Sequence, residues 1–205
     1  VKDNIHAWTT PYGMIYEFPA LLIELIIGSE NIREVFLYRH KLIFTFHFLG
    51  IIAFFFFSKE VFVTNNKAFL STLVYSLHPR IFAHSFFNPK DIIFLAVLTL
   101  SLFPIIKFYK TKQIKWLIIS SISIGLAMSC RIVGLYMPFL IIIFYSINEW
   151  IDYRTFDIKN ILSNISKCES ILLISFFILY LFTPYYWSHP IQSFIETFQS
   201  AKQFP

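Results

Sequence analysis

The sequence has few charged side chains and only two cysteines. Asp, Glu, Lys and Arg make up 14% of its 205 residues, whereas about a quarter of a soluble domain is charged. Cys130 and Cys168 are too few and too far apart to indicate a disulfide framework or a metal cluster. The histidines show no HxxxH spacing, and the chain has no glycine-rich phosphate loop and no serine nucleophile elbow. The patterns of common soluble enzymes are therefore absent.

Apolar and aromatic residues dominate instead. Hydrophobic residues make up 57% of the chain and aromatic residues 20%, including 26 Phe and 11 Tyr, as suits lipid-facing and interfacial surfaces. No signal peptide is visible, and we expect the chain to be a fragment of a longer protein. Six apolar runs, all without Asp or Glu, predict membrane helices: 42–57, 68–79, 92–109, 115–130, 134–147 and 170–184. We predict an all-α fold, a polytopic transmembrane helix bundle of about six spans.

Two further segments favour helices that lie on the membrane surface. Residues 14–28 contain Pro19 and carry Glu17 and Glu24, seven positions apart and so on one helical face. Burying a charge near the centre of a span costs about 3 kcal/mol. An interfacial helix with its acids in water therefore fits better than a span. Apolar residues recur at helical spacing near 190–200, which predicts a second interfacial helix.

The distribution of lysine and arginine predicts the orientation in the membrane. Nine of these residues fall in the loops 58–67, 107–115 and 148–169, and four fall in the opposite set. The positive-inside rule places the first set in the cytoplasm. The net charge of +5 is thus explained by topology, and no basic stripe indicates nucleic-acid binding. The segment 79–91, the corner at Arg131 and the tail 185–205 then face the external compartment.

The segment 77–91 carries the densest group of side chains suited to chemistry. Arg80, His84, Lys90 and Asp91 lie between two membrane runs, in a stretch interrupted by prolines. Asp91 is the candidate catalytic carboxylate, and the cations suit a phosphate. The alternative is structural: Asp91 caps the following helix, and Arg80 and Lys90 anchor at lipid head groups.

Arg131 and the aromatic tail are the other candidates on that side. Arg131 lies between two apolar runs, so it either snorkels to the surface or binds a carboxylate or phosphate. Trp187 and His189 follow Tyr185 and Tyr186, in a pattern typical of a membrane–water interface. Stacking of these rings on a sugar is the functional alternative.

Several stretches together resemble bacterial family-39-type glycosyltransferases of the GT-C fold, relatives of protein O-mannosyltransferases and of lipid A aminoarabinose transferases. The most specific stretch is Pro-Arg-Ile-Phe-Ala-His-Ser-Phe-Phe-Asn-Pro-Lys-Asp at 79–91. The other stretches are Tyr-Gly at 12–13, Glu-Phe-Pro-Ala at 17–20, Arg-His-Lys at 39–41, Gly-Leu-Ala-Met-Ser-Cys-Arg at 125–131 and Thr-Pro-Tyr-Tyr-Trp-Ser-His-Pro at 183–190. The likeness extends over nearly the whole chain.

The resemblance implies a polyprenyl-phosphate sugar donor, transfer on the external face of the cell inner (plasma) membrane, and inversion at the sugar carbon. It implies a base in the first external loop, which we expect upstream of Val1, and it matches Asp91 to a second external-loop acid. Some relatives bind the donor phosphate with a Lys before a Pro; here Phe18 precedes Pro19. The expected donor-phosphate and substrate-binding residues are Tyr12, Glu17, Arg80, His84, Lys90, Arg131, Trp187 and His189.

Other functions stay open at this point. A multi-pass transporter or flippase would place ionisable groups near the midplane and show internal repeats, and neither feature is visible here. A non-catalytic protein of envelope assembly is a third hypothesis. The resemblance leaves the sugar, the acceptor and the participation of a divalent metal undetermined.

Overall fold

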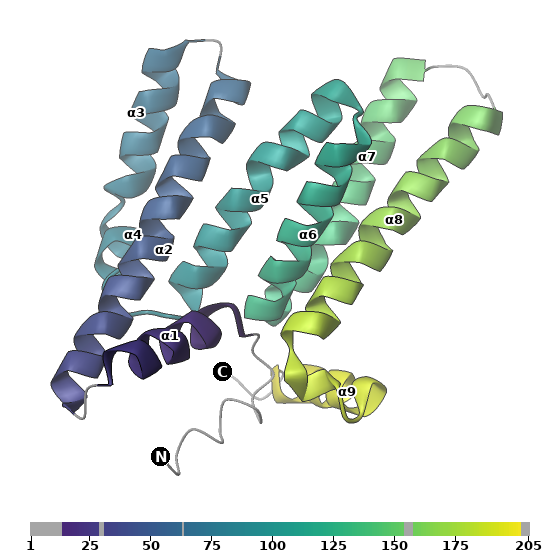
Figure 1. The fold of residues 1–205 in the computed structure, drawn as a ribbon. Helices are drawn as coiled ribbons and strands as arrows, with labels where there is room; N and C mark the ends of the chain where they lie inside the picture. Colours follow the sequence, from purple (N-terminus) through teal and green to yellow (C-terminus); the bar gives the residue numbers. More distant parts are fainter. Residues whose placement is uncertain (1–13, 29–30, 63, 154–157, 202–205) are drawn as a thin grey trace.

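The computed structural model describes residues 14–28, 31–62, 64–153 and 158–201, and this part of the chain is helical without strands (Figure 1). Its α-helices are α1 (Met14–Ile27), α2 (Ile32–Val61), α3 (Asn65–Ser76), α4 (Pro79–His84), α5 (Asp91–Thr111), α6 (Ile114–Cys130), α7 (Tyr136–Tyr153), α8 (Ile158–Phe182) and α9 (Pro190–Ala201). Two short 3₁₀ helices, η2 (Ile132–Leu135) and η3 (Pro184–Tyr186), follow α6 and α8. The predicted all-α bundle is confirmed.

Local chemistry explains several of the helix boundaries. The side chain of Asn31 accepts a hydrogen bond from the backbone N–H of Arg33 (3.0 Å) and so caps the start of α2. Pro79 lacks an N–H and opens α4, which separates α4 from α3. Lys112 adopts a left-handed conformation (φ 54°) at the end of α5, so the chain reverses into α6 within a short turn.

Each of the six predicted apolar runs coincides with a helical segment. Four segments are long and apolar enough to cross a membrane: Ile32–Val61, Asp91–Thr111, Ile132–Ile151 and Leu162–Phe182. Helix α6 is apolar but has 17 residues. The 12 residues of α3 extend over about 18 Å, less than the roughly 30 Å of a hydrocarbon core. The number of six spans stays a prediction.

Helices α2 and α8 begin earlier than their apolar runs. They start at Ile32 and Ile158, whereas the runs start at residues 42 and 170. Hydropathy reports burial in lipid, and a helix continues into water wherever its backbone hydrogen bonds are satisfied. The apolar runs therefore mark the membrane part of each helix and underestimate its length.

Neighbouring helices of the bundle pack closely: α5 runs parallel to α2 and antiparallel to α6, and α6 runs parallel to α8. Helix α5 contacts α2 and α6, and α6 contacts α8. A Cβ at Gly125 would lie 2.6 Å from the carbonyl oxygen of Ser175, so α6 and α8 approach each other at a glycine. The hydroxyl of Ser175 donates to the carbonyl oxygen of Ser121 (3.1 Å) at the same contact.

Helices α1 and α9 lie across the same end of the bundle, while the long helices run roughly side by side (Figure 1). Helix α1 buries Tyr16 and Ala20 against the bundle. Helix α1 lies across the end of the long helices, as an interfacial helix would. Its position in a membrane stays a prediction. This end of the molecule carries the starts of α2, α5 and α7 and the ends of α6 and α8.

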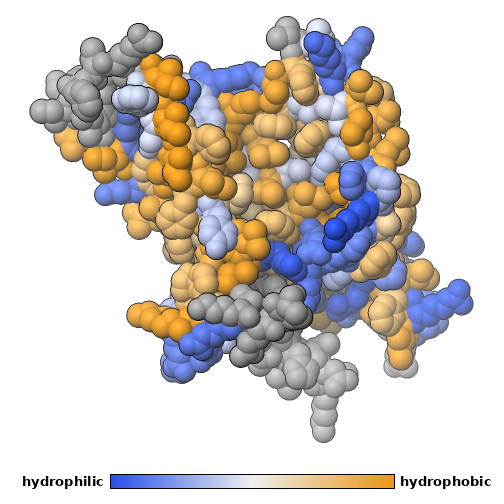
Figure 2. Space-filling model, turned by 180° about the vertical axis from the view of Figure 1, so that it is seen from behind, coloured by the Kyte–Doolittle hydropathy of each residue, from blue (hydrophilic) through white to orange (hydrophobic). Residues whose placement is uncertain are grey.

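The outside of the bundle is largely apolar. Figure 2 shows hydrophobic side chains over the sides of the molecule and hydrophilic ones gathered mainly in its lower half. Many large hydrophobic residues are exposed, including Phe177, Leu173 and Ile143. A water-facing monomer seldom exposes so much contiguous apolar surface. A lipid environment accounts for this surface, in agreement with the helices long enough to cross a membrane.

Candidate functional site

An ion pair joins the start of α5 to the end of α6. Nη1 of Arg131 lies 3.0 Å from Oδ1 of Asp91, and the side chains are 36% and 56% exposed respectively. The two residues are far apart in sequence, and the antiparallel packing of α5 on α6 brings them together. The structure therefore unites two of the residues that the sequence nominated.

Asn88 holds the other side of the Asp91 carboxylate. Its Nδ2 donates to Oδ2 of Asp91 (3.0 Å) and also lies 2.8 Å from Nδ1 of His84. Since Nδ2 is a donor, Nδ1 of His84 is the acceptor in this contact. Asn88 was not among the residues predicted from the sequence, although the spacing of His84, Asn88 and Asp91 suits contacts between residues three and four positions apart.

Asn88 also organises the backbone that begins α5. Its Oδ1 accepts from the backbone N–H groups of Lys90 (3.2 Å) and Asp91 (3.0 Å), and an Asn-Pro pair favours such a turn. The amide oxygen of Asn88 thus binds two backbone N–H groups at the start of α5, while the carboxylate of Asp91 contacts Asn88 and Arg131. Asp91 also lies in the first turn of α5, where a carboxylate is favourable, so the structural interpretation of Asp91 stays open beside the functional one.

The charges of this pair leave capacity for a ligand. Each carboxylate oxygen of Asp91 accepts from one partner and can accept at least one further hydrogen bond. More than half of the Asp91 side chain is exposed. Arg131 carries five N–H donors, of which the ion pair uses only part. A hydroxyl could hydrogen-bond to the carboxylate while an oxyanion binds the guanidinium.

The chain directly after Arg131 makes a tight corner. The backbone N–H of Gly134 donates to the carbonyl oxygen of Arg131 (2.8 Å). A Cβ at Gly134 would lie 2.7 Å from Cα of Met128, too close for any other residue without a backbone shift. This corner sets the direction in which Arg131 leaves α6.

The other nominated residues of the first half take different positions. Glu17 contacts Arg39 of α2 (3.4 Å), as does Glu24 (2.6 Å), and neither acid simply faces water as the sequence predicted. Arg80 is exposed on α4, and the structure shows it in no ion pair with a described carboxylate. Lys90 is exposed beside Asp91. Tyr12 lies outside the described residues.

Trp187 and His189 lie between η3 and α9, at the same end of the bundle. The indole N–H of Trp187 donates to the carbonyl oxygen of Tyr180 (2.8 Å), and about half of the side chain is exposed. His189 is exposed and its carbonyl accepts from the backbone N–H of Ser193 (2.8 Å). A hydrogen bond to Glu196 raises the pKa of Tyr185 above its usual value, with burial as the second cause.

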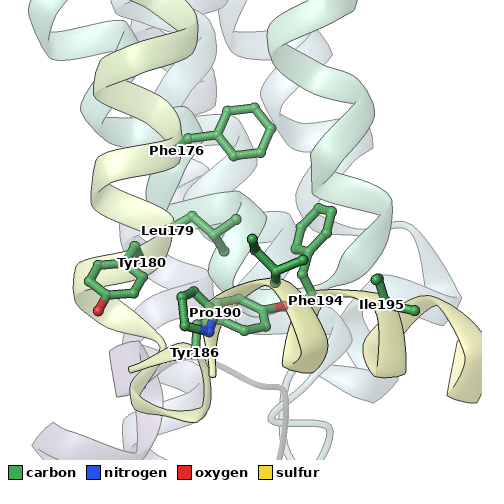
Figure 3. A pocket seen from close by; sticks show the side chains of 8 residues that line it. Phe176, Leu179, Tyr180, Tyr186, Pro190, Phe194 and Ile195 are labelled. Carbon is green, nitrogen blue, oxygen red and sulfur yellow. The ribbon is translucent and has the colours of Figure 1, made fainter. Parts of the chain in front are cut away.

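An apolar groove of about 290 Å³ lies between α8 and α9 (Figure 3). Its walls are Phe176, Leu179, Tyr180, Tyr186, Pro190, Ile191, Phe194 and Ile195. Helix α9 also contacts η2, the segment that follows Arg131. The groove is thus joined through η2 to the end of the bundle that carries the Asp91–Arg131 pair.

The described residues include no group of three or more His, Cys, Asp and Glu placed to hold a metal ion. The cation beside Asp91 is the guanidinium of Arg131.

One comparison with known proteins returned a match. The sequence model of a family described as dolichyl-phosphate-mannose-protein mannosyltransferase matches residues 42–187, more than two thirds of the chain. No curated protein and no solved structure matches the chain. The matched range contains Asn88, Asp91, Arg131 and Trp187, whereas α1 precedes it.

Proposed function

The chain belongs to the dolichyl-phosphate-mannose-protein mannosyltransferase family, and from this premise we propose that it transfers a sugar from a polyprenyl-phosphate donor to an acceptor at the external face of the cell inner (plasma) membrane. Membership makes the chain part of a membrane glycosyltransferase that uses a lipid-linked sugar. It disfavours the transporter and scaffold hypotheses. The face of the membrane, the polyprenyl carrier and the membrane's identity belong to the proposal.

The observation that carries the proposal is the Asp91–Arg131 pair, supported by Asn88, at the end of the bundle crossed by α1 and α9. In the proposed reaction the acceptor hydroxyl attacks the anomeric carbon. The bond from that carbon to the phosphate oxygen breaks, and its electron pair leaves with the lipid phosphate. A carboxylate takes the hydroxyl proton; the family resemblance assigns this base to the first external loop.

We assign to Arg131 the stabilisation of the leaving phosphate. A guanidinium can donate two parallel hydrogen bonds to phosphate oxygens, and it stays charged during the reaction. It therefore stabilises the negative charge that develops on the phosphate as the bond breaks. Asp91 orients Arg131 and accepts a hydrogen bond from the reacting groups, while Asn88 and His84 fix the carboxylate.

The groove between α8 and α9 suits the hydrocarbon chain of the donor. Its walls are apolar and aromatic, and α9 contacts the segment that follows Arg131. A phosphate at Arg131 would therefore place the first isoprene units near the groove. Burial of a CH₂ group contributes about 0.8 kcal/mol, so a short contact with the chain is enough to help position the donor.

The test compares Asp91→Asn and Arg131→Gln with wild type in the full-length protein reconstituted in liposomes. We measure transfer of radiolabelled sugar from a synthetic polyprenyl-phosphate sugar. Each variant should lose about 100-fold in kcat, the usual cost of removing one group that stabilises developing charge. Glu169→Gln, at an exposed acid elsewhere on α8, is the control and should keep the wild-type rate. Wild-type rates in both site variants would overturn the assignment.

A further inference from the structure

Three charged side chains connect α1 to α2 at the end of the bundle. Nε of Arg39 lies 2.6 Å from Oε1 of Glu24, and its Nη1 lies 3.4 Å from Oε2 of Glu17. The hydroxyl of Tyr16 donates to the carbonyl oxygen of Arg39 (3.4 Å). We call Glu17, Glu24 and Arg39 the Arg39 cluster. One guanidinium thus binds two carboxylates that lie about two turns apart on one face of α1.

The inner face of α1 packs directly beside the Asp91–Arg131 pair. Tyr16 and Ala20 are 7% and 2% exposed, and they share an apolar cluster with Ile92, Ile93 and Ala127. Ile92 and Ile93 follow Asp91 at the start of α5, and Ala127 lies in the last turn of α6 before Arg131. The position of α1 therefore constrains both helix ends that carry the pair.

Helix α1 depends on such an anchor. It has 14 residues and contains Pro19, and an isolated helix of that length is marginal. Its second half contributes little burial, since Leu25 and Ile26 are 78% and 83% exposed. Gly28 follows in a left-handed conformation (φ 58°), which gives the connection to α2 a sharp turn. Among the described residues, the Arg39 cluster adds a charged contact with α2 to the burial of Tyr16 and Ala20.

We propose that Arg39 is a positioning residue that holds α1 against the ends of α5 and α6 and so keeps Asp91 and Arg131 in their working geometry. This inference rests on the proposed function. It assigns Glu17 to the binding of Arg39 and not to the binding of donor or acceptor. Arg39 and α1 precede the residues that match the family model, so the cluster is argued from the contacts in this chain.

A double-mutant cycle in the full-length protein tests the proposal. Arg39→Gln, Glu24→Gln and Glu17→Gln should lower kcat, the first two by about tenfold or more, because displacement of a reacting group by 1 Å can cost up to about 100-fold. Glu17→Gln combined with Arg39→Gln should be no slower than Arg39→Gln alone, because both changes break one contact. The exchange Arg39→Glu with Glu24→Arg should restore part of the rate. Arg33→Gln, at an exposed arginine of the same helix, should behave as wild type.

A further tenfold loss when Glu17→Gln is added to Arg39→Gln would show that Glu17 acts on the substrate directly, and would overturn the proposal. So would a wild-type kcat for Arg39→Gln while Asp91→Asn is inactive, since the proposed function would then stand without the positioning role.

The geometry is also measurable without any activity. Cys130 packs against the cluster formed by Tyr16, Ala20 and their neighbours. In a Cys168→Ser background, Arg39→Gln should increase the rate at which a maleimide modifies Cys130 by about tenfold, which corresponds to a decrease of about 1.4 kcal/mol in the free energy of opening. An unchanged rate would contradict the anchoring role, whether or not the protein transfers sugar.

Discussion

At the scale of single residues, the end of the bundle opposite the Asp91–Arg131 pair carries a buried charge. The side chain of Glu149 on α7 is 5% exposed and pairs with the ammonium of Lys112, in the turn between α5 and α6. Lys112 also lies over the ring of Tyr145, 5.1 Å from its centre. The hydroxyl of Tyr145 accepts from Nζ of Lys167 (3.0 Å). A buried carboxylate of this kind depends on its partner.

Removal of Lys112 should therefore destabilise the protein strongly. Lys112→Met leaves the buried carboxyl group of Glu149 without the ammonium group that it contacts, and breaking a buried ion pair costs about 3–5 kcal/mol. Lys110→Met is the matched control, because Glu60 keeps Lys107 at 2.7 Å and an exposed pair contributes less than about 1 kcal/mol. Thermal unfolding in detergent should show a far lower Tm for the first variant than for the second. Equal Tm values would contradict the pairing of Lys112 with Glu149.

At the scale of elements, α9 closes the groove on α8 with an amphipathic face. Phe194 packs towards the core cluster that contains Tyr186, while Ile191 and Ile195 are exposed at the wall of the groove. Ser193 and Thr197 are buried on the inner face of α9. The hydroxyl of Thr197 donates to the carbonyl oxygen of Ser193 (2.8 Å) and accepts from the hydroxyl of Tyr186 (3.5 Å). The exposed wall of the groove can thus be changed with little effect on folding.

Ile195→Asn should weaken binding of long-chain donors selectively. Loss of contact with about two CH₂ groups amounts to about 1.6 kcal/mol and predicts a KM raised by roughly tenfold for the long-chain donor. A water-soluble donor with one isoprene unit should bind equally well to variant and wild type. Gln199→Ala changes an exposed residue of α9 outside the groove and should leave both KM values unchanged. A rise in KM for both donors in Ile195→Asn would contradict the assignment of the groove to the hydrocarbon chain.

At the scale of the whole molecule, the described charges gather at two opposite ends. Glu60 pairs with Lys107 and Lys110, and Glu149 pairs with Lys112, around the turn from α5 to α6. The Asp91–Arg131 pair and the Arg39 cluster lie at the end crossed by α1 and α9. The sides between these ends are largely apolar. This arrangement allows a direct test of orientation.

Cysteine labelling should place the two ends on opposite sides of the membrane. In a background with Cys130→Ser and Cys168→Ser, we change the exposed residues Phe87 and Lys115 separately to cysteine. A membrane-impermeant maleimide should label Phe87→Cys in intact cells and Lys115→Cys only after the membrane is opened, as the distribution of lysine and arginine predicts. The reverse pattern would place the Asp91–Arg131 pair in the cytoplasm and contradict transfer at the external face.

Much of the fold follows from local sequence. Runs of apolar residues without Asp or Glu can satisfy their backbone in lipid only as helices, so the six runs coincide with helical segments. Pro19, Glu17 and Glu24 distinguished residues 14–28, the segment that forms α1, from the apolar runs predicted to span the membrane. Asp91 and Arg131 were nominated because ionisable side chains next to apolar runs are expensive unless they have a partner. Each of these inferences needs only neighbours in the chain.

The tertiary structure alone decided which charges meet. Glu17 was predicted to bind substrate, but its carboxylate contacts Arg39. Asn88 was not predicted, but its amide hydrogen-bonds to Asp91. Glu149 is buried and contacts Lys112. An ion pair depends on a separation of a few ångströms between side chains from different helices. That separation is set by how the helices pack at contacts such as Gly125 against Ser175. Sequence thus determined the helices and their membrane character, through interactions local to the chain, whereas packing between distant segments determined the partners.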